Sequence, residues 1–277
     1  MDEGKKTGQE RAVIESRNLS WKPEGRSDAV LKRLTLTFEA GHMYGIIGPN
    51  GSGKSSFLRH VMGFLKVQEG ALEWLGKPVG EYRRRELAKT AAFVPQQTAI
   101  DTDFSAYEIV MTGRNPHQKR FQGTSTADRK KAEEALAFTD CSSLKDQPFA
   151  SLSGGEAQRV IVSRAIAQEA AWMLLDEPIA SLDIKNQVEL MEGLKRLNQE
   201  KGISMVMVLH DLNLAAAYCD RLIMLKQGQV LFAGETKQGM TCDRLFELYG
   251  IRFLRAETED GRPLFYPVYG KEGVDIR

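Results

Sequence analysis

Residues 48–55 combine the residue types that hold the phosphates of a nucleotide. They read Gly-Pro-Asn-Gly-Ser-Gly-Lys-Ser and fit the P-loop pattern, in which a glycine and four further residues precede Gly-Lys-Ser. The glycines let backbone N–H groups turn toward a phosphate without a Cβ in the way. We expect Lys54 to reach the β- and γ-phosphates and the hydroxyl of Ser55 to bind Mg²⁺. The predicted ATP-binding residues are Gly48, Pro49, Asn50, Gly51, Ser52, Gly53, Lys54, Ser55 and Ser56.

Residues 152–159 form a second polar turn that can hold a phosphate. They read Leu-Ser-Gly-Gly-Glu-Ala-Gln-Arg. We expect Ser153 to cap the helix that follows, because a serine oxygen accepts the free N–H groups of a first helical turn. Gly154 and Gly155 leave the remaining amides of that turn open to an anion. Together with the P-loop, this turn indicates a chain that closes around ATP.

Two adjacent carboxylates follow a compact apolar run. Residues 171–175, Ala-Trp-Met-Leu-Leu, predict a central strand of a parallel sheet, and Asp176-Glu177 follow it directly. Side chains at the carboxyl end of such a strand face the ligand crevice. Asp176 is placed to hold Mg²⁺, and Glu177 is the candidate general base for the water that attacks the γ-phosphate. Two solvated acids at a strand end are a common alternative, but the P-loop favours the catalytic interpretation.

Several elements must position these residues. The short apolar run 42–47 predicts a buried strand before the P-loop, and apolar residues at helical spacing predict a helix from near Lys54. Strand, glycine-rich loop and helix are the context in which a P-loop functions. Two further apolar runs, 91–95 and 205–209, also predict strands.

The remaining chain predicts one cassette with an inserted helical part. Residues from about 11 to 40 alternate in a strand-like way and predict an antiparallel β lobe. After this lobe and the P-loop core, apolar residues again occur at helical spacing, so we expect a helical subdomain at about 97–165. We place an ATPase domain at 11–250 and a short C-terminal extension at 251–277.

The ordered motifs resemble the ATP-binding subunits of ABC transporters. The resemblance runs from about Val13 to Tyr249. Its most specific element is Leu-Ser-Gly-Gly-Glu at 152–156. It implies an α/β fold with a P-loop NTPase core of the ABC-ATPase type, an antiparallel β lobe and an inserted helical subdomain. The residues that carry it are 48–55, Gln96, 152–159, 174–178, 181–183 and His210.

This resemblance also implies roles for residues that mean little alone. Gln96 is expected to touch Mg²⁺ or the attacking water, and His210 to contact the γ-phosphate through its imidazole. Two copies are expected to pair head to tail, so that each ATP lies between one P-loop and the turn of the other copy. The residues expected to contact the ATP of the partner are Ser153, Gly154, Gly155 and Glu156, with Asp183 coupling the two sites.

The sequence departs from the family pattern at two positions. Many relatives place an aromatic residue, which stacks on adenine, two positions after the one that Trp21 occupies; here that position holds Pro23. Either Trp21 replaces it, or Trp21 is a packed strand residue and adenine is held by aliphatic contacts. Ile179 stands where threonine is usual, and we expect only a packing change there.

Composition excludes several functional classes. The 277 residues suffice for one large α/β domain, and 38 basic and 37 acidic residues do not suggest a nucleic-acid partner. Three scattered cysteines predict a reducing compartment and no disulfide framework. Because no apolar run approaches the ~20 residues that cross a bilayer, we expect the membrane-spanning subunits to come from other chains. A polytopic permease would then hold this protein at the cytoplasmic face of the cell membrane.

Three segments resemble the ATPases of importers for metal chelates, meaning iron-siderophore, haem or cobalamin. They are residues 113–117, 183–187 and 208–215. In that group, a substrate-binding protein delivers the solute to the permease, so it would be an indirect partner. We expect the segment from Gln97 to Asn115 to form the groove that receives the permease. The alternatives are an ATPase of another transporter class or a soluble ABC ATPase without transport.

Overall fold

A six-stranded sheet forms the centre of the molecule. The structure, a computed structural model, describes residues 14–96, 103–118 and 123–270. Val13, Gln97 and the outer bounds of the expected domains lie outside these ranges. The strand order is β10 (Gln229–Glu235), β9 (Arg221–Lys226), β3 (Met43–Ile47), β8 (Ser204–Val208), β7 (Trp172–Asp176) and β6 (Ala91–Val94). All neighbours are parallel except β10 and β9.

The central strands are completely buried. Every residue of β3, β7 and β8 is buried, as expected for parallel strands covered on both faces. The strands predicted at 42–47, 171–175, 91–95 and 205–209 are confirmed to within two residues at each end. Because these strands are parallel, their carboxyl ends meet at one edge, which is where the predicted site residues follow.

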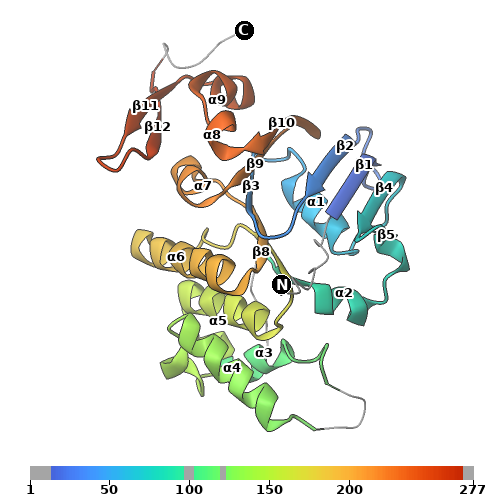
Figure 1. Cartoon of the computed structure of the whole chain (residues 1–277), viewed down its shortest axis with the longest axis vertical. Coiled ribbons are helices and arrows are strands. Elements are labelled where there is room, and N and C mark those ends of the chain that lie inside the picture. Colours follow the sequence, from blue (N-terminus) through green and yellow to red (C-terminus); the bar gives the residue numbers. More distant parts are fainter. Residues whose placement is uncertain (1–13, 97–102, 119–122, 271–277) are drawn as a thin grey trace, which may run out of the picture.

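A second, antiparallel sheet covers one side of this core. Its order is β2 (Leu31–Phe38), β1 (Ile14–Trp21), β4 (Glu69–Trp74) and β5 (Lys77–Pro78), seen beside the core in Figure 1. Helix α1 (Lys54–Val61) packs between the two sheets. Trp74 secures it by donating its ring N–H to the Val61 carbonyl at 2.8 Å. The predicted lobe at 11–40 therefore also recruits 69–78, since β1 pairs with β4 across the P-loop and α1.

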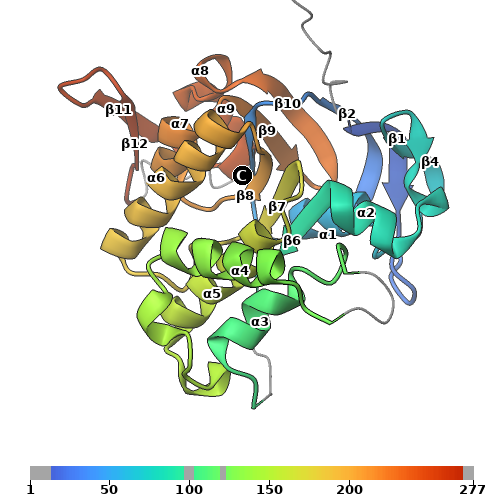
Figure 2. The same ribbon diagram turned by 60° about the horizontal axis from the view of Figure 1, so that its bottom comes forward.

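A group of helices forms the opposite end of the molecule. Helices α3 (Ala106–Thr112), α4 (Thr126–Phe138) and α5 (Gly154–Ala167) pack together, as Figures 1 and 2 show. Each begins with a serine whose hydroxyl accepts from the third residue of the helix while an acid there binds back, which is a capping box. The pairs are Ser105 with Glu108, Ser125 with Asp128, and Ser153 with Glu156.

A buried arginine joins the ends of these helices. The side chain of Arg114 is only 8% exposed; its Nε contacts Asp128 at 2.9 Å and its Nη1 contacts Glu169 at 2.9 Å. Nη1 also donates to the Ala167 carbonyl. A buried guanidinium with several acceptors is stable only while they all remain in place. Arg114 therefore connects the residues that follow α3 and α5 to the first turn of α4.

The last part of the chain folds back onto the core. Strands β11 (Phe253–Glu257) and β12 (Pro263–Pro267) form a hairpin that packs on α7 (Leu212–Tyr218). The side-chain amide of Asn213 accepts from the Phe265 N–H at 2.7 Å and donates to the Phe265 carbonyl at 3.4 Å.

The remaining elements are η1 (Val79–Glu81), α2 (Arg84–Thr90), η2 (Ser142–Leu144), η3 (Phe149–Ser151), α6 (Ile184–Lys201), α8 (Thr236–Gly239) and α9 (Cys242–Tyr249). In the part of the chain that the structure describes, no helix has the length and apolar character to cross a membrane.

Gly113 provides a test of how tightly the helices pack. A Cβ on Gly113 would lie 2.2 Å from the Arg164 carbonyl oxygen of α5. Since neither backbone can retreat without breaking helical hydrogen bonds, we expect Gly113→Ala to lower the free energy of unfolding by about 1–3 kcal/mol. Urea denaturation measures the change. Gly80→Ala is the matched control, because nothing lies within 4 Å of its Cβ position; equal stability of the two variants would contradict the close approach.

Candidate nucleotide-binding site

The P-loop needs glycine at two positions for steric reasons. Gly48 has φ +152°, and a Cβ there would lie 2.1 Å from the Leu225 carbonyl oxygen of β9. Gly53 has φ +103°, and a Cβ there would lie 2.7 Å from Leu31 Cδ2. Both values of φ favour glycine, and both sites are closed by neighbouring strands. The loop is therefore wedged between the core sheet and the β lobe at the carboxyl end of β3.

Lys54 lies inside this loop. Its side chain is buried, and its Nζ donates to the carbonyls of Gly48 at 2.8 Å and Pro49 at 3.1 Å. Burial lowers the pKa of the ammonium, although the nearby carboxylates of Glu177 and Asp176 act in the opposite direction. An ammonium ion held within a ring of backbone groups is positioned to meet the phosphates of a nucleotide.

Ser55 and Asp176 meet at the end of β7. The Ser55 hydroxyl donates to Asp176 Oδ1 at 2.8 Å, and Asp176 is 1% exposed. Burial raises the pKa of this carboxyl, and the hydrogen bond from Ser55 only partly offsets it. These two oxygens suit Mg²⁺, which takes one or two protein oxygens and completes its shell with water and phosphate. No cluster of three or more His, Cys, Asp or Glu in the described ranges forms a metal site of its own.

Three loops converge on Glu177. Gln96 follows β6, Glu177 follows β7 and His210 lies just beyond β8, so adjacent parallel strands deliver them to one place. Gln96 Nε2 donates to Glu177 Oε2 at 2.8 Å, and His210 Nε2 lies 2.6 Å from Glu177 Oε1. Glu177 has φ +53°, an uncommon conformation for a residue with a side chain, and its N–H donates to the Val208 carbonyl. This backbone turn directs the carboxylate between the other two side chains.

The second polar turn lies on the helical side of the molecule. Ser153 and Gly154 are exposed at the start of α5, and the Ser153 hydroxyl donates to Glu156 Oε2 at 2.7 Å. Hydrogen bonds from Ser153 lower the pKa of Glu156. Whereas α1 packs between the two sheets, α5 lies among the helices in Figure 2, so the turn and the P-loop belong to different layers.

Asp183 connects this turn to helix α6. Its side chain caps α6 by accepting from the Asn186 N–H at 2.9 Å, and Arg159 of α5 donates to the Asn186 side chain at 2.8 Å. A Cβ on Gly155 would lie 3.3 Å from Leu182. The turn at 153–156 and the segment 181–183 are therefore packed against each other.

One supporting residue, Tyr249, carried no signal in the sequence. Burial raises the pKa of this tyrosine of α9 to about 12, an effect that the neighbouring backbone of Gly48 partly offsets. It occupies an ordinary apolar position in a short amphipathic helix, in no recognisable motif. Only the fold, which brings α9 beside the P-loop, shows that Tyr249 lies next to Gly48, the first residue of that loop.

Trp21 is a packed strand residue. Its ring meets the His60 ring of α1 at 5.1 Å in an edge-on arrangement and packs against the core cluster between the sheets. Pro23, two residues later, is half-buried. A cavity of about 450 Å³ lies between the 25–30 loop, Lys32, Gly51 and Gln227, with no aromatic residue in its wall. In its packing, Trp21 matches the strand residue of the second alternative.

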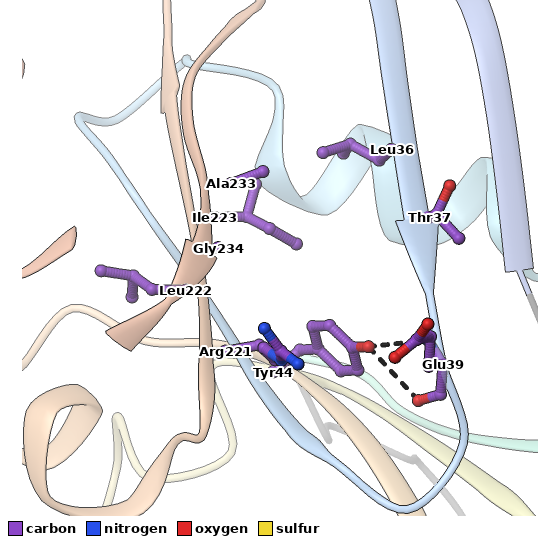
Figure 3. Close-up of a pocket in the computed structure, with 9 residues that line it drawn as sticks. All are labelled: Leu36, Thr37, Glu39, Tyr44, Arg221, Leu222, Ile223, Ala233 and Gly234. Carbon is purple, nitrogen blue, oxygen red and sulfur yellow. Dashed lines mark hydrogen bonds between the residues drawn. The ribbon is translucent and has the colours of Figure 1, made fainter. Parts of the chain in front are cut away.

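Figure 3 shows another cavity, of about 260 Å³, between β2, β3, β9 and β10. The Tyr44 hydroxyl accepts from the Glu39 N–H at 2.7 Å in its wall. Tyr44 and Arg221 stand at the amino ends of β3 and β9, whereas the P-loop follows the carboxyl end of β3. This cavity is therefore remote from the predicted site.

Comparisons with known proteins agree with this geometry. Residues 31–180 match the family described as "ABC transporter". The hemin import ATP-binding protein HmuV of Escherichia coli O157:H7 is 36% identical over 244 residues, covering 86% of this chain and 92% of that protein. The ferric enterobactin transport ATP-binding protein FepC of Escherichia coli strain K12 is 37% identical over 241 residues, covering 86% and 89%.

A solved structure shares the fold over nearly the whole chain. It is an inward-facing transporter described as being of the metal-chelate ABC type. The TM-score is 0.81 at 27% identity, covering 93% of this chain and 98% of the matched chain. The likeness thus extends well beyond the P-loop core.

Asp176 provides a test of the site through pH. Its folded pKa is raised, so the folded state binds more protons than the unfolded state between the two pKa values, and stability falls as pH rises through that window. At neutral pH, Asp176→Asn should therefore raise the melting temperature of the nucleotide-free protein while abolishing ATP hydrolysis. Calorimetry from pH 4 to pH 8 measures the effect; a variant less stable than the parent at neutral pH would contradict it.

Proposed function

This chain belongs to the ABC transporter family, and we propose that it powers the import of a metal chelate through a separate membrane permease. ATP hydrolysis is its reaction. The observation that carries the ATPase activity is the convergence of Gln96, Glu177 and His210 next to the Ser55–Asp176 pair, and the metal-chelate class is supported by the named relatives. This arrangement can orient a water molecule at the end of a triphosphate that the P-loop holds.

The roles of the site residues follow from their positions. Lys54 binds the β- and γ-phosphates, and the P-loop amides surround them. Glu177 accepts the proton of the attacking water, because its carboxylate lies at the mouth of the site with 13% of its side chain exposed. Gln96 and His210 hold that carboxylate from both sides and are released to water and γ-phosphate when nucleotide binds. When bound, Mg²⁺ would be held by Ser55 and Asp176, with Gln96 nearby, and would neutralise charge on the phosphates.

We infer that two copies pair head to tail around ATP. The support is that the Ser153 turn presents open helical amides and exposed surface in a different layer from the P-loop. Helix N-terminal amides stabilise anions, and a γ-phosphate held in the partner's P-loop supplies one. Ser153, Gly154, Gly155 and Glu156 then complete the partner's site, and Asp183 moves with them.

The transported solute is proposed only at the level of its class. HmuV and FepC are almost equally similar to this chain, yet one is named for hemin and the other for ferric enterobactin. Both solutes are iron chelates. Since an ATPase subunit bound to a permease does not meet the solute, uptake assays with haem, ferric siderophores and cobalamin in the reconstituted transporter must decide among them.

A groove between the β lobe and the helices is the proposed permease contact. It measures about 780 Å³. Phe64, 59% exposed, lines one side, and Thr112 and Asn115 line the other. Of the expected segment from Gln97 to Asn115, only its end lines the groove among described residues, because Ile109 and Val110 are buried against the other helices. Permease docking here would place the protein at the cytoplasmic face of the membrane.

Glu177→Gln tests the site and the dimer together. The amide cannot take the proton, so we expect hydrolysis to fall by roughly 10²–10⁴-fold while ATP still binds. Light scattering after size exclusion should then show a dimer with ATP and a monomer without it. Adding Lys54→Ala should abolish this dimer by weakening nucleotide binding. A monomer under all conditions would argue against the head-to-tail pairing, and hydrolysis at the parent rate would exclude Glu177 as the base.

Phe64→Asp tests the groove. A buried charge in the contact should weaken copurification with the permease by at least about tenfold and leave the basal ATPase rate of the isolated protein unchanged. Leu75→Asp is the control, since Leu75 is also exposed, at 48%, but lies in the β4–β5 turn. Equal loss of permease binding in both variants would place the contact elsewhere.

A further inference from the structure

We propose that the C-terminal hairpin of one copy forms a socket for helix α6 of the other, with Ile184 and Val188 as the inserted side chains. The proposal rests on the head-to-tail dimer of the proposed function. It adds a contact that involves no nucleotide.

The socket is a cavity of about 510 Å³ beside the P-loop. One rim consists of residues 48–50, and the other of His210, Asp211 and the start of α7. The apolar wall comes mainly from the end of the chain. It consists of Leu212, Tyr249, Ile251, Phe253, Phe265 and Pro267.

This wall is fixed to the nucleotide-binding machinery. Asn213 lies three residues after His210, and its side-chain amide hydrogen-bonds both the N–H and the carbonyl of Phe265. The hairpin is closed by the Val268 N–H donating to the Arg252 carbonyl at 2.8 Å. Tyr249 lines the same cavity as Gly48. The wall of the cavity is thus held in place beside the nucleotide-binding residues.

The proposed occupant is an apolar pair at the start of α6. Ile184 is 80% exposed and Val188 is 42% exposed. Residues four apart lie on the same helix face, so the two side chains present one apolar edge. Ile184 is the first residue of α6, directly after the capping Asp183. Removing such an exposed apolar side chain from water would be favourable.

The proposed dimer carries this pair to the cavity. Asp183 belongs to the unit that includes the Ser153 turn, because Gly155 packs against Leu182 and Arg159 binds Asn186. When the turn of one copy reaches the P-loop of the other, the start of its α6 arrives at the flank of that P-loop. That flank is the socket.

The arrangement on the molecule permits the contact to form twice. A two-fold interface requires both partners of each contact to lie on one face of the subunit. In Figures 1 and 2, α6 and the β11–β12 hairpin project from the same side of the molecule. Each dimer therefore contains two sockets, and their contacts add apolar burial to the closed, ATP-bound pair.

Crosslinking between two separately prepared chains tests the contact. In a Cys242→Ser background, whose remaining Cys141 and Cys219 are buried, one preparation carries Ile184→Cys and the other Ile251→Cys. With Glu177→Gln in both chains and ATP present, a short bifunctional maleimide should join the two chains. Glu200→Cys, in the last turn of α6, replaces Ile184→Cys in the matched control and should give no product with Ile251→Cys.

The contribution of Ile184 is measured on the Glu177→Gln background with ATP. Ile184→Asn should weaken the dimer by roughly ten- to hundredfold, and a polar residue at the first helical position is compatible with folding. Leu254→Asn is the control, because Leu254 is 64% exposed on the hairpin and does not line the cavity. An ATP-dependent dimer with no Ile184–Ile251 crosslink would overturn the socket and leave the ATP sandwich standing. Equal dimer affinity in Ile184→Asn and Leu254→Asn would also overturn it.

Discussion

The site depends on the parallel alignment of strands that are buried on both faces. Because β3, β7 and β8 expose no residue, their register is set by packing on two sides at once. Their carboxyl ends coincide, and each delivers a polar side chain to the same edge. A one-residue slip of β7 would turn Asp176 from Ser55 and Glu177 from Gln96 and His210. The chemistry of the site is therefore a consequence of sheet register.

The same register explains where unfavourable features occur. Asp176 is buried with a raised pKa, Lys54 is buried with a lowered pKa, and Glu177 has a left-handed backbone conformation. Each feature costs stability in the isolated chain and is tolerated because the surrounding strands hold it. Groups with such perturbed environments gather at functional sites. Bound phosphates, and the Mg²⁺ proposed here, would relieve these costs by pairing with the buried charges.

The rest of the chain connects this edge to the two surfaces that we propose as contacts for other proteins. Arg114 joins the ends of three helices, so the groove proposed for the permease and the Ser153 turn belong to one packed unit. Asn213 and Tyr249 connect the C-terminal hairpin to the loop of His210 and to the P-loop. Both surfaces are therefore joined by side-chain contacts to segments assigned to nucleotide binding.

The sequence alone determined the elements and the chemistry that depend on local order. The P-loop, the Asp176–Glu177 pair and the cap at Ser153 could be predicted because each needs particular residues at fixed spacing in one segment. Only the tertiary structure decided that β4 and β5 join the lobe, that Trp21 packs on His60, and that Asn213 binds Phe265 across 52 residues. It also decided that Tyr249 supports Gly48, and that an apolar cavity forms beside the P-loop. These contacts join segments far apart in the chain, and their residue types satisfy many environments equally well, so no local pattern identifies their partners.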